Sequence, residues 1–521
     1  MMKKMKRKFN QFMISKSLIA ASVTLALMGG ISTAVNANEY VPKYKADVSE
    51  EMLTPDSVMT KYAGELTFKD AFPTDETFAK ANDYMDTARA FTLFGSAVPT
   101  VAMHAMLKGH RDIGVIPNKT VALTEQLIDA RSLWLTPNTT TPYAHAEINV
   151  KNGPVVIEVG SPVISILDNA YFLYVGDIGL GNAQDGGKGG KYLVVGQDYK
   201  GEIPKGYIVL KTNTYRQWML TRPFQAPNES LEETLSKFKN GIKIYPLAEA
   251  DNPQPVEFMN ISGKKYSTLH ATDSSIYDEL NEVIQYEPAN SGDPELLGLA
   301  KAIGMEKGKE FKPDTRMQKI LTEAASLGNA AYRGVMFKPR NPDVYFYPDR
   351  KWFSPLSSGS YEFLSKTGAR LIDDRVGFHL FATGVTPFMV KPTVGAGSVY
   401  EIGSMDETGK MLDGGKTYSV TLPGPVPARD FWSFMVYDNQ TRSILETDQK
   451  TGGVDSKLAG MKKSEDGSVT IFFGPQAPKG QEKNWVQTVP NKGFNVLLRL
   501  YGPEQEWFDK TWKPGDFELV K

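Results

Sequence analysis

Short β-branched runs separated by turn residues are the feature that most constrains the fold of this chain. In the part between Leu133 and Thr221, such runs include Pro154–Val159, Tyr192–Val195 and Tyr207–Leu210, with Gly, Pro, Asn and Asp between them. A strand signal also covers Tyr171–Val175. The connections are too short for crossover helices, so neighbouring strands should run antiparallel. The sequence therefore predicts an antiparallel β domain, which we place at residues 130–255.

A second series of short strands fills the C-terminal part of the chain. It includes Lys416–Leu422, Phe431–Tyr437, Val469–Phe473 and Phe494–Tyr501, spaced by turn signals such as Asp466-Gly467. Even spacing of short strands and turns is typical of a β-sandwich or jelly roll. We place this second β domain at residues 375–521.

Two regions have helical periodicity instead. Apolar side chains recur at helical spacing from Phe78 to Phe94, behind a capping residue and two acids, so residues 38–129 are predicted to be a helical segment. Residues 256–374 form a predicted helical connecting region, with a helix between Asp293-Pro294 and Gly304 and another over Arg316–Tyr332. The predicted fold class is mainly β with helical segments: two antiparallel, sandwich-like or jelly-roll-like domains joined by a helical region.

The first 37 residues differ in composition from the rest of the chain and predict a secretory signal peptide. Six basic residues precede the apolar run Leu18–Met28, and Val35 and Ala37 supply small residues for a cleavage site. The mature chain should begin near Asn38, in the periplasm or secreted from the cell. The apolar run is shorter than the roughly 20 residues that cross a bilayer, so no membrane span is expected.

Charge and cysteine content narrow the classes of partner and chemistry. The chain has 59 basic and 60 acidic residues, and without the six basic residues of the signal the mature part has 53 basic residues against 60 acidic. An acidic balance without a basic cluster argues against nucleic acid as a partner. No cysteine is present, so disulfides, thiol nucleophiles and thiolate metal sites are excluded.

The stretch DIGLGNAQDGGKGG, residues 177–190, could be taken for a phosphate-binding loop. Such a loop needs a helix directly after it, whereas a β-branched run follows here, so the stretch is predicted to be a hairpin loop that binds no nucleotide. Side-chain oxygens of this stretch, together with a carboxylate from a preceding strand, could instead bind calcium. Those candidate ligands are Asp168, Asp177, Asn182 and Asp185. Their spacing matches no EF-hand, so capping of the loop is the favoured interpretation, and no other cofactor or metal is predicted.

Several stretches resemble a family of exported bacterial proteins with two tandem domains of unknown function, numbers twelve fifty-four and twelve fourteen. The first domain is matched by Thr136–Tyr143, Gly153–Val159, Leu167-Asp168 and Lys211–Asn213 to Arg222. The second is matched by Phe431–Ser433 with Tyr437-Asp438, Asp466–Ser468, Asn484-Trp485 to Pro490, and Leu498–Pro503. The resemblance covers roughly Asp75 to Trp512 and implies architecture and export, with no settled activity. The family usually has an Asp where this chain has Thr140.

The polar residues of the first domain supply the candidate site. Asn138, Thr139 and Tyr143 lie at a strand start, where they either cap a turn or form a polar site, and Arg222 could orient an anionic or carbonyl group. Tyr143 and His145 should share one strand face. The predicted catalytic residues are Tyr143, His145 and Asp168, and the predicted binding residues of this domain are Asn138, Thr139 and Arg222.

Aromatic residues of the second domain supply further candidates. Trp432 and Trp485 either fill a core or, with Asp438, form an aromatic platform with polar anchors for a small-molecule or glycan-like ligand. The five histidines have no zinc-protease spacing and no Gly-x-Ser-x-Gly motif occurs. Two classes of function stay open: a cofactor-independent, hydrolase-like enzyme with its site between the β domains, and a non-catalytic binding or assembly protein of the envelope. Either could form a homo-oligomer.

Overall fold

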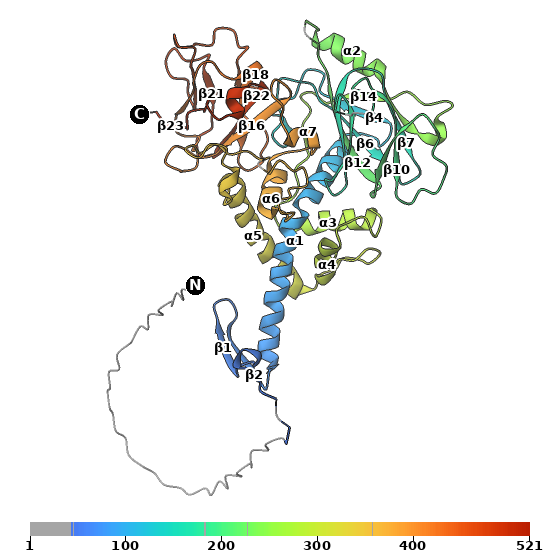
Figure 1. The fold of residues 1–521 in the computed structure, drawn as a ribbon, viewed down its shortest axis with the longest axis vertical. Helices are drawn as coiled ribbons and strands as arrows, with labels where there is room; N and C mark the ends of the chain where they lie inside the picture. Colours follow the sequence, from blue (N-terminus) through green and yellow to red (C-terminus); the bar gives the residue numbers. More distant parts are fainter. Residues whose placement is uncertain (1–42, 45, 182–183, 227, 357, 521) are drawn as a thin grey trace, which may run out of the picture.

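The computed structural model describes residues 43, 44, 46–181, 184–226, 228–356 and 358–520, which form a mixed fold of several sheets and helices (Figure 1). The expectation of a mainly β protein is corrected, because helices account for a large share of the described residues and supply much of the core. The predicted signal peptide, residues 1–37, and the mature start near Asn38 lie outside the described residues.

Two facing groups of strands make up the first β region. The six-stranded sheet has the order β14 (Glu257–Asn260), β4 (Thr120–Leu123), β6 (Ala144–Asn149), β12 (Arg216–Pro223), β8 (Val163–Asn169) and β9 (Tyr174–Gly179). The four-stranded sheet has the order β11 (Ile208–Thr212), β10 (Gly190–Gly196), β7 (Val155–Val159) and β13 (Ile242–Pro246). Pairing is antiparallel except between β4 and β14 and between β10 and β11. The outer strands β4 and β14 lie beyond the range 130–255 expected from the sequence.

Strand alternation separates the two faces of the six-stranded sheet. On β6, Ala144, Ala146 and Ile148 enter a hydrophobic cluster that also contains β7 and β10 residues of the other sheet and side chains of α2 (Leu231–Gly241). The intervening residues of β6, His145 and Glu147, therefore point to the opposite face. That opposite face is turned toward the remainder of the molecule and carries the candidate site.

The C-terminal region contains two further four-stranded sheets. One has the order β16 (Ser398–Gly403), β22 (Phe494–Pro503), β18 (Ala428–Asp438) and β19 (Gly453–Asp455); the other has β21 (Trp485–Gln487), β20 (Val469–Gly474), β17 (Tyr418–Leu422) and β23 (Glu518–Leu519). On β22, Leu498 and Leu500 enter the cluster that contains residues of both sheets. Their neighbours Leu497, Arg499 and Tyr501 point the other way, toward the first β region.

The helix α1 (Asp75–Asp112) runs through the centre of the molecule, with one β region on each side of its C-terminal half (Figure 1). Thr74 caps it by accepting a hydrogen bond from the amide of Thr77. The helices of the connecting region pack around α1: α3 (Ser275–Tyr286), α4 (Pro294–Ala302), α5 (Thr315–Phe337) and α6 (Ile372–Phe381). Asp293 caps α4 as its sequence indicated.

The remaining elements are short. They are β1 (Ser57–Thr60), β2 (Gly64–Lys69), β3 (Phe72–Pro73), β5 (Ser132–Leu133), β15 (Tyr266–Ser267), α7 (Pro387–Val390), α8 (Gln505–Phe508) and three 3-10 turns at Glu50–Met52, Leu247–Glu249 and Pro342–Val344. The β1–β3 hairpin lies at the N-terminal end of α1, which projects from the body (Figure 1). By length and composition alone α1 could cross a membrane, and 83% of its most apolar window is buried inside the protein, as in a core helix.

The glycine-rich stretch 177–190 joins two sheets. Its first three residues belong to β9, which pairs with β8, and its last residue, Gly190, begins β10, which pairs with β7 and β11. The predicted strand after the glycines is therefore present, but the hairpin interpretation is corrected because β9 and β10 are not partners.

Candidate functional site

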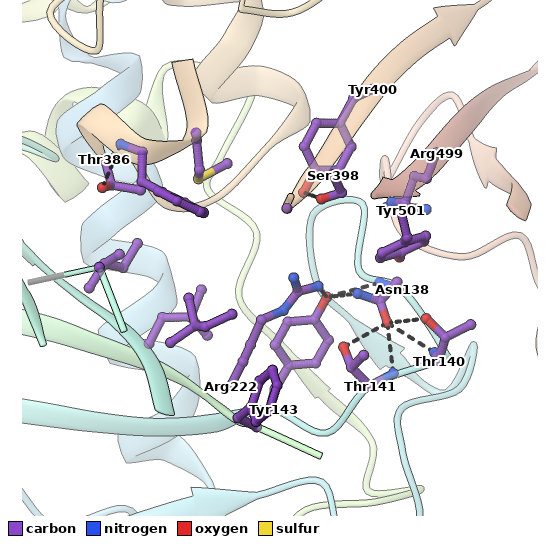
Figure 2. A pocket seen from close by; sticks show the side chains of 18 of the residues that line it. Asn138, Thr140, Thr141, Tyr143, Arg222, Thr386, Ser398, Tyr400, Arg499 and Tyr501 are labelled. Atoms are coloured by element: carbon purple, nitrogen blue, oxygen red, sulfur yellow. Dashed lines mark hydrogen bonds between the residues drawn. The ribbon is translucent and has the colours of Figure 1, made fainter. Parts of the chain in front are cut away.

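A cleft of about 1100 Å³ lies between the two β regions. Its walls come from three parts of the chain: the segment before β6 with strands β8 and β12, the segment around α7, and strands β16 and β22. Figure 2 shows polar side chains of the first and third parts facing one another across this space. The volume is that of a site for a drug-sized molecule.

The wall from the first β region is built by strand alternation. Thr221 and Ser165 share a 2.7 Å hydrogen bond on the face toward the other sheet, while Leu220 and Arg222 of β12 point into the cleft. Ile164 and Ile166 of β8, which pair with Arg222 and Leu220, lie beside them. Arg222 is thus a single cation on an otherwise apolar part of the wall.

Asn138 organises the turn before β6. Its side-chain oxygen accepts hydrogen bonds from the amides of Thr140 and Thr141, at 2.9 and 3.0 Å, and from both of their hydroxyls. The capping interpretation of this stretch is therefore correct, and it also directs the amide nitrogen of Asn138 toward Tyr143, 2.6 Å from the phenol oxygen.

Three N–H groups converge on the phenol oxygen of Tyr143. They are the side-chain and backbone nitrogens of Asn138, at 2.6 and 3.2 Å, and Nη2 of Arg222, at 3.2 Å (Figure 2). Burial raises the pKa of Tyr143, but the charges of Arg222 and Arg499 and these hydrogen bonds outweigh burial and place that pKa below its ordinary value. A tyrosine in this setting loses its proton more readily than one in water.

The opposite wall carries Arg499, which is 3% exposed. Its Nη2 donates to the carbonyl of Thr136 at 2.9 Å and to the hydroxyl of Tyr437 at 2.8 Å, and so joins β22 to the Asn138 turn. Its Nη1 has no acceptor within the described residues. Tyr400 and Tyr501 line the cleft on the same side (Figure 2).

Asp168 lies buried outside the cleft, and Asp177 lines it. Asp168 is fully buried, accepts a hydrogen bond from the amide of Val385 at 2.9 Å, and does not line the cleft. Asp177 lines it and accepts from Thr386 at 2.7 Å and from Tyr174 at 3.0 Å. Burial raises the pKa of both carboxyls, and for Asp168 the neighbouring Asp177 raises it further. The two acids hold the segment before α7 against β8 and β9.

His145 shares the strand face of Tyr143, as expected, but it does not line the cleft. It is 1% exposed, and the edge of Trp134 contacts both rings, with centroids 4.5 Å from Tyr143 and 4.7 Å from His145. Its other ring neighbours are His110 and Trp218. Burial and His110 lower the pKa of His145 far below its ordinary value, so it is neutral at physiological pH.

The other predicted residues lie away from the cleft. Thr139 contacts the sulfur of Met435, and Trp432, 5% exposed, is part of the C-terminal core. Trp485 is half-buried and donates to the carbonyl of Gly474 at 2.8 Å. Asp438 accepts from the amides of Gln440 and Thr441 and pairs with Lys492. The structure therefore gathers Asn138, Tyr143 and Arg222 at the cleft and separates them from these four.

Sequence reasoning missed Arg499, Tyr400 and Tyr501. A signal for Arg499 was present, because an arginine within the apolar stretch from Phe494 to Leu500 must either find a partner or reach a pocket. Nothing in the sequence indicated which strand of the first region it would face.

No group of three or more His, Cys, Asp or Glu side chains is placed to hold a metal ion in the part of the chain that is described. At the glycine-rich stretch, Asp185 accepts from the amide of Gly187 at 2.6 Å and from the hydroxyl of Tyr192, which is the capping expected there. Asn182 lies outside the described residues. Calcium at this stretch stays a prediction.

Comparison with known proteins gives two family models and several solved structures. Protein of unknown function (DUF1254) matches residues 117–246 and protein of unknown function (DUF1214) matches residues 397–505. A crystal structure of the VPA0106 protein from Vibrio parahaemolyticus is similar over 84% of this chain and 100% of its own, with 19% identity and a TM-score of 0.50. This likeness concerns the fold alone.

An uncharacterised protein from Burkholderia cenocepacia is 11% identical, over 85% of this chain and 96% of its own, with a TM-score of 0.35. No curated protein matches the chain. The first matched domain spans β4 to β13 and the second spans the strands from β16 to β22, so each supplies one wall of the cleft. The chain carries the two domains of unknown function, DUF1254 and DUF1214, in tandem.

Proposed function

We propose that the protein is an exported enzyme that acts on a small molecule in the cleft, with Tyr143 as the group that exchanges a proton. The reaction that fits best is hydrolase-like and needs no organic cofactor. The observation that carries the proposal is the convergence of three N–H donors on one buried phenol oxygen at the cleft wall.

The number of donors bears on the protonation state of Tyr143. A phenol oxygen has two lone pairs and one proton, whereas a phenolate oxygen has three lone pairs. Three N–H donors therefore match the phenolate. A tyrosine with a lowered pKa can act as a general base near neutral pH, provided that one acceptor direction is opened to the reacting group.

Arg222 is the donor that a substrate would displace. Its hydrogen bond to Tyr143 is 3.2 Å long, against 2.6 Å for the Asn138 side chain, and Arg222 is only half-buried. When Arg222 turns to a substrate oxygen, its hydrogen bond to Tyr143 breaks. One lone pair of the Tyr143 oxygen is then free to accept a proton from the substrate. Asn138 then holds the ring and its oxygen in place.

The alternative is a non-catalytic binding protein of the envelope, and one observation favours it. The two other candidates for proton transfer, His145 and Asp168, do not line the cleft, so Tyr143 has no second acid or base beside it from that set. A binding site would need the same cleft and the same arginine, but not the phenolate.

Hydrolysis of 4-nitrophenyl esters of increasing chain length, by wild type and Tyr143→Phe, tests the proposal. We expect kcat/KM to fall by about 100-fold or more in Tyr143→Phe. The matched control is Tyr277→Phe, which removes a buried hydroxyl bound to the carbonyl of Ala90, far from the cleft, and should keep full activity. Equal activity of wild type and Tyr143→Phe would contradict the proposal, and ligand binding without any hydrolysis would support the alternative.

Export has its own test. Sequencing the N-terminus of protein from the periplasm or medium should give a start near Asn38. A cytoplasmic chain that begins at Met1 would contradict it.

A further inference from the structure

We infer that the cleft selects organic anions, with a carboxylate bound by Arg222 in the field of the Arg499 charge and an apolar body along the wall of β8, β12 and α7. The inference rests on the proposed function only in that the ligand occupies this cleft; it does not depend on catalysis.

Among the described residues, neither guanidinium group has a carboxylate partner. Three acidic side chains line the cleft, and each has another bond: Asp177 with Thr386, Glu229 with Lys237, and Asp430 with Arg429. Within the described residues, no ion pair joins Arg222 or Arg499 to any acid. Five basic and three acidic side chains line the cleft, so the wall carries an excess of positive charge.

Arg499 shows most clearly that a partner is needed. It is only 3% exposed, and its Nη2 is bound to Thr136 and Tyr437 while Nη1 has no acceptor in the part of the chain that is described. A buried charge without a counter-charge is costly, whereas an anion that binds a guanidinium group gains strong, charge-assisted hydrogen bonds. Arg222, which is half-buried, is the donor open to such an anion, and Arg499, whose Nη1 is itself buried, adds a second positive charge from the opposite wall.

The remainder of the wall fits an alkyl or aryl body. Ile164, Ile166 and Leu220 line one side, and Phe388 and Met389 of the α7 segment line another. Ile164 and Phe388 are 36% and 47% exposed, so they have apolar surface still to be covered. An inorganic anion would leave this surface in water, and a sugar would place hydroxyl groups against it.

An anion at this place would also act on Tyr143. The charges of Arg222 and Arg499 lower the pKa of Tyr143, so a ligand carboxylate that neutralises them should raise that pKa toward its ordinary value. Tyrosinate absorbance can follow this change, with Tyr143→Phe as the blank.

Calorimetric titration with octanoate and with octanamide, its neutral match, tests the inference. We expect octanoate to bind wild type at least tenfold more tightly than octanamide, and inorganic phosphate to bind more weakly than octanoate. In Arg222→Gln the preference for octanoate should disappear. Arg429→Gln is the matched control, because Arg429 lines the same cleft but is paired with Asp430, and it should keep the preference.

A second variant guards against a folding defect in the first. Thr140→Asp places a carboxylate on the cleft wall and should compete with octanoate, lowering its affinity at least tenfold while octanamide binding stays unchanged. Equal binding of octanoate and octanamide by wild type, or a preference that survives in both variants, would overturn the inference. If wild type showed no preference for octanoate over octanamide but kept its Tyr143-dependent ester hydrolysis, this inference alone would be rejected and the proposed function would stand.

Discussion

Two polar clusters lie next to each other in this protein, and only one of them reaches solvent. The cleft cluster consists of Asn138, Tyr143, Arg222 and Arg499, and the interior cluster of His110, His145 and Trp218. Tyr143 and His145 are two residues apart, with ring centroids 6.2 Å from each other. The phenol oxygen receives three N–H donors, while both ring nitrogens of His145 lack a partner among the described residues.

The difference shows what a polar side chain needs in order to stay charged. Arg222 is half-buried and borders an open cleft, so water or a ligand can solvate its charge. His145 contacts the rings of His110, Trp134 and Trp218, and burial keeps it neutral. Trp134 lines the cleft and contacts the rings of both Tyr143 and His145, so it lies at the border of the candidate site.

Removing the cap at Asn138 should have the largest effect on the cleft cluster. Asn138→Ala leaves the amides of Thr140 and Thr141 without their acceptor and Tyr143 without its shortest hydrogen bond. We expect the free energy of unfolding to fall by about 2–4 kcal/mol, measured by urea denaturation.

Asn138→Asp is the matched control, because a carboxylate still accepts from both threonine amides. It should cost less stability than Asn138→Ala but raise the pKa of Tyr143, since a negative charge replaces an N–H donor. An unchanged tyrosinate titration in Asn138→Asp would show that Asn138 does not set the charge state of the cleft cluster.

The interior cluster should respond to acid. The lowered pKa of His145 means that the unfolded chain takes up a proton below its ordinary pKa of about 6.5 while the folded chain does not, so stability is lost as the pH falls below that value. In His145→Phe this loss should be smaller by up to about 1.4 kcal/mol per pH unit between pH 6 and about 4. Urea denaturation at several pH values measures the slope; an identical slope in both proteins would mean that His145 is solvated after all.

Asp168 should change the stability with pH in the opposite direction to His145. Its raised pKa means that the folded chain keeps a proton that the unfolded chain has lost, so its contribution to stability falls as the pH rises above about 4. Asp168→Asn retains an acceptor for the amide of Val385 and removes the titration. Relative to wild type, we expect Asp168→Asn to gain stability between pH 4 and 6, by about 1 kcal/mol per pH unit at most. A gain at the lower pH instead would show that Asp168 is ionised in the folded protein.

Asp438→Asn should have the smallest effect and marks the boundary of the cleft. Asp438 binds two backbone amides and Lys492, which is partly exposed, so we expect a loss of about 1 kcal/mol in the free energy of unfolding. Octanoate binding should not change. A tenfold weaker affinity for octanoate in Asp438→Asn would show that the site extends to this residue, beyond the cleft cluster.

Local patterns in the sequence were sufficient for most elements of the fold. The run from Phe494 to Tyr501 alternates in β22, the periodic stretch from Phe78 continues as α1, and Asp293-Pro294 starts α4. These predictions succeeded because strand alternation, helical spacing and caps depend on residues a few positions apart. The hairpin at residues 177–190 failed because a glycine-rich loop does not specify which sheet the next strand joins.

The candidate site was only partly predictable. Asn138 and Tyr143 lie five residues apart, and their polarity at a strand start pointed to a shared role. The choice between Tyr143 and His145 could not be made, because strand alternation puts both on one face and gives no information about which of them borders the cleft.

By itself, the sequence determined the tandem order of the two domains, the alternation of their strands and the cap at Asn138, since each depends on residues that are close together in the chain. Only the tertiary structure decided that Arg499 reaches the carbonyl of Thr136, 363 positions away in the chain. It also decided that Arg222 and Arg499 lie on opposite walls of one cleft. The physical reason is that charge and burial at the site are set by packing between domains. Whether a polar side chain is solvated or paired depends on neighbours that the order of residues does not specify.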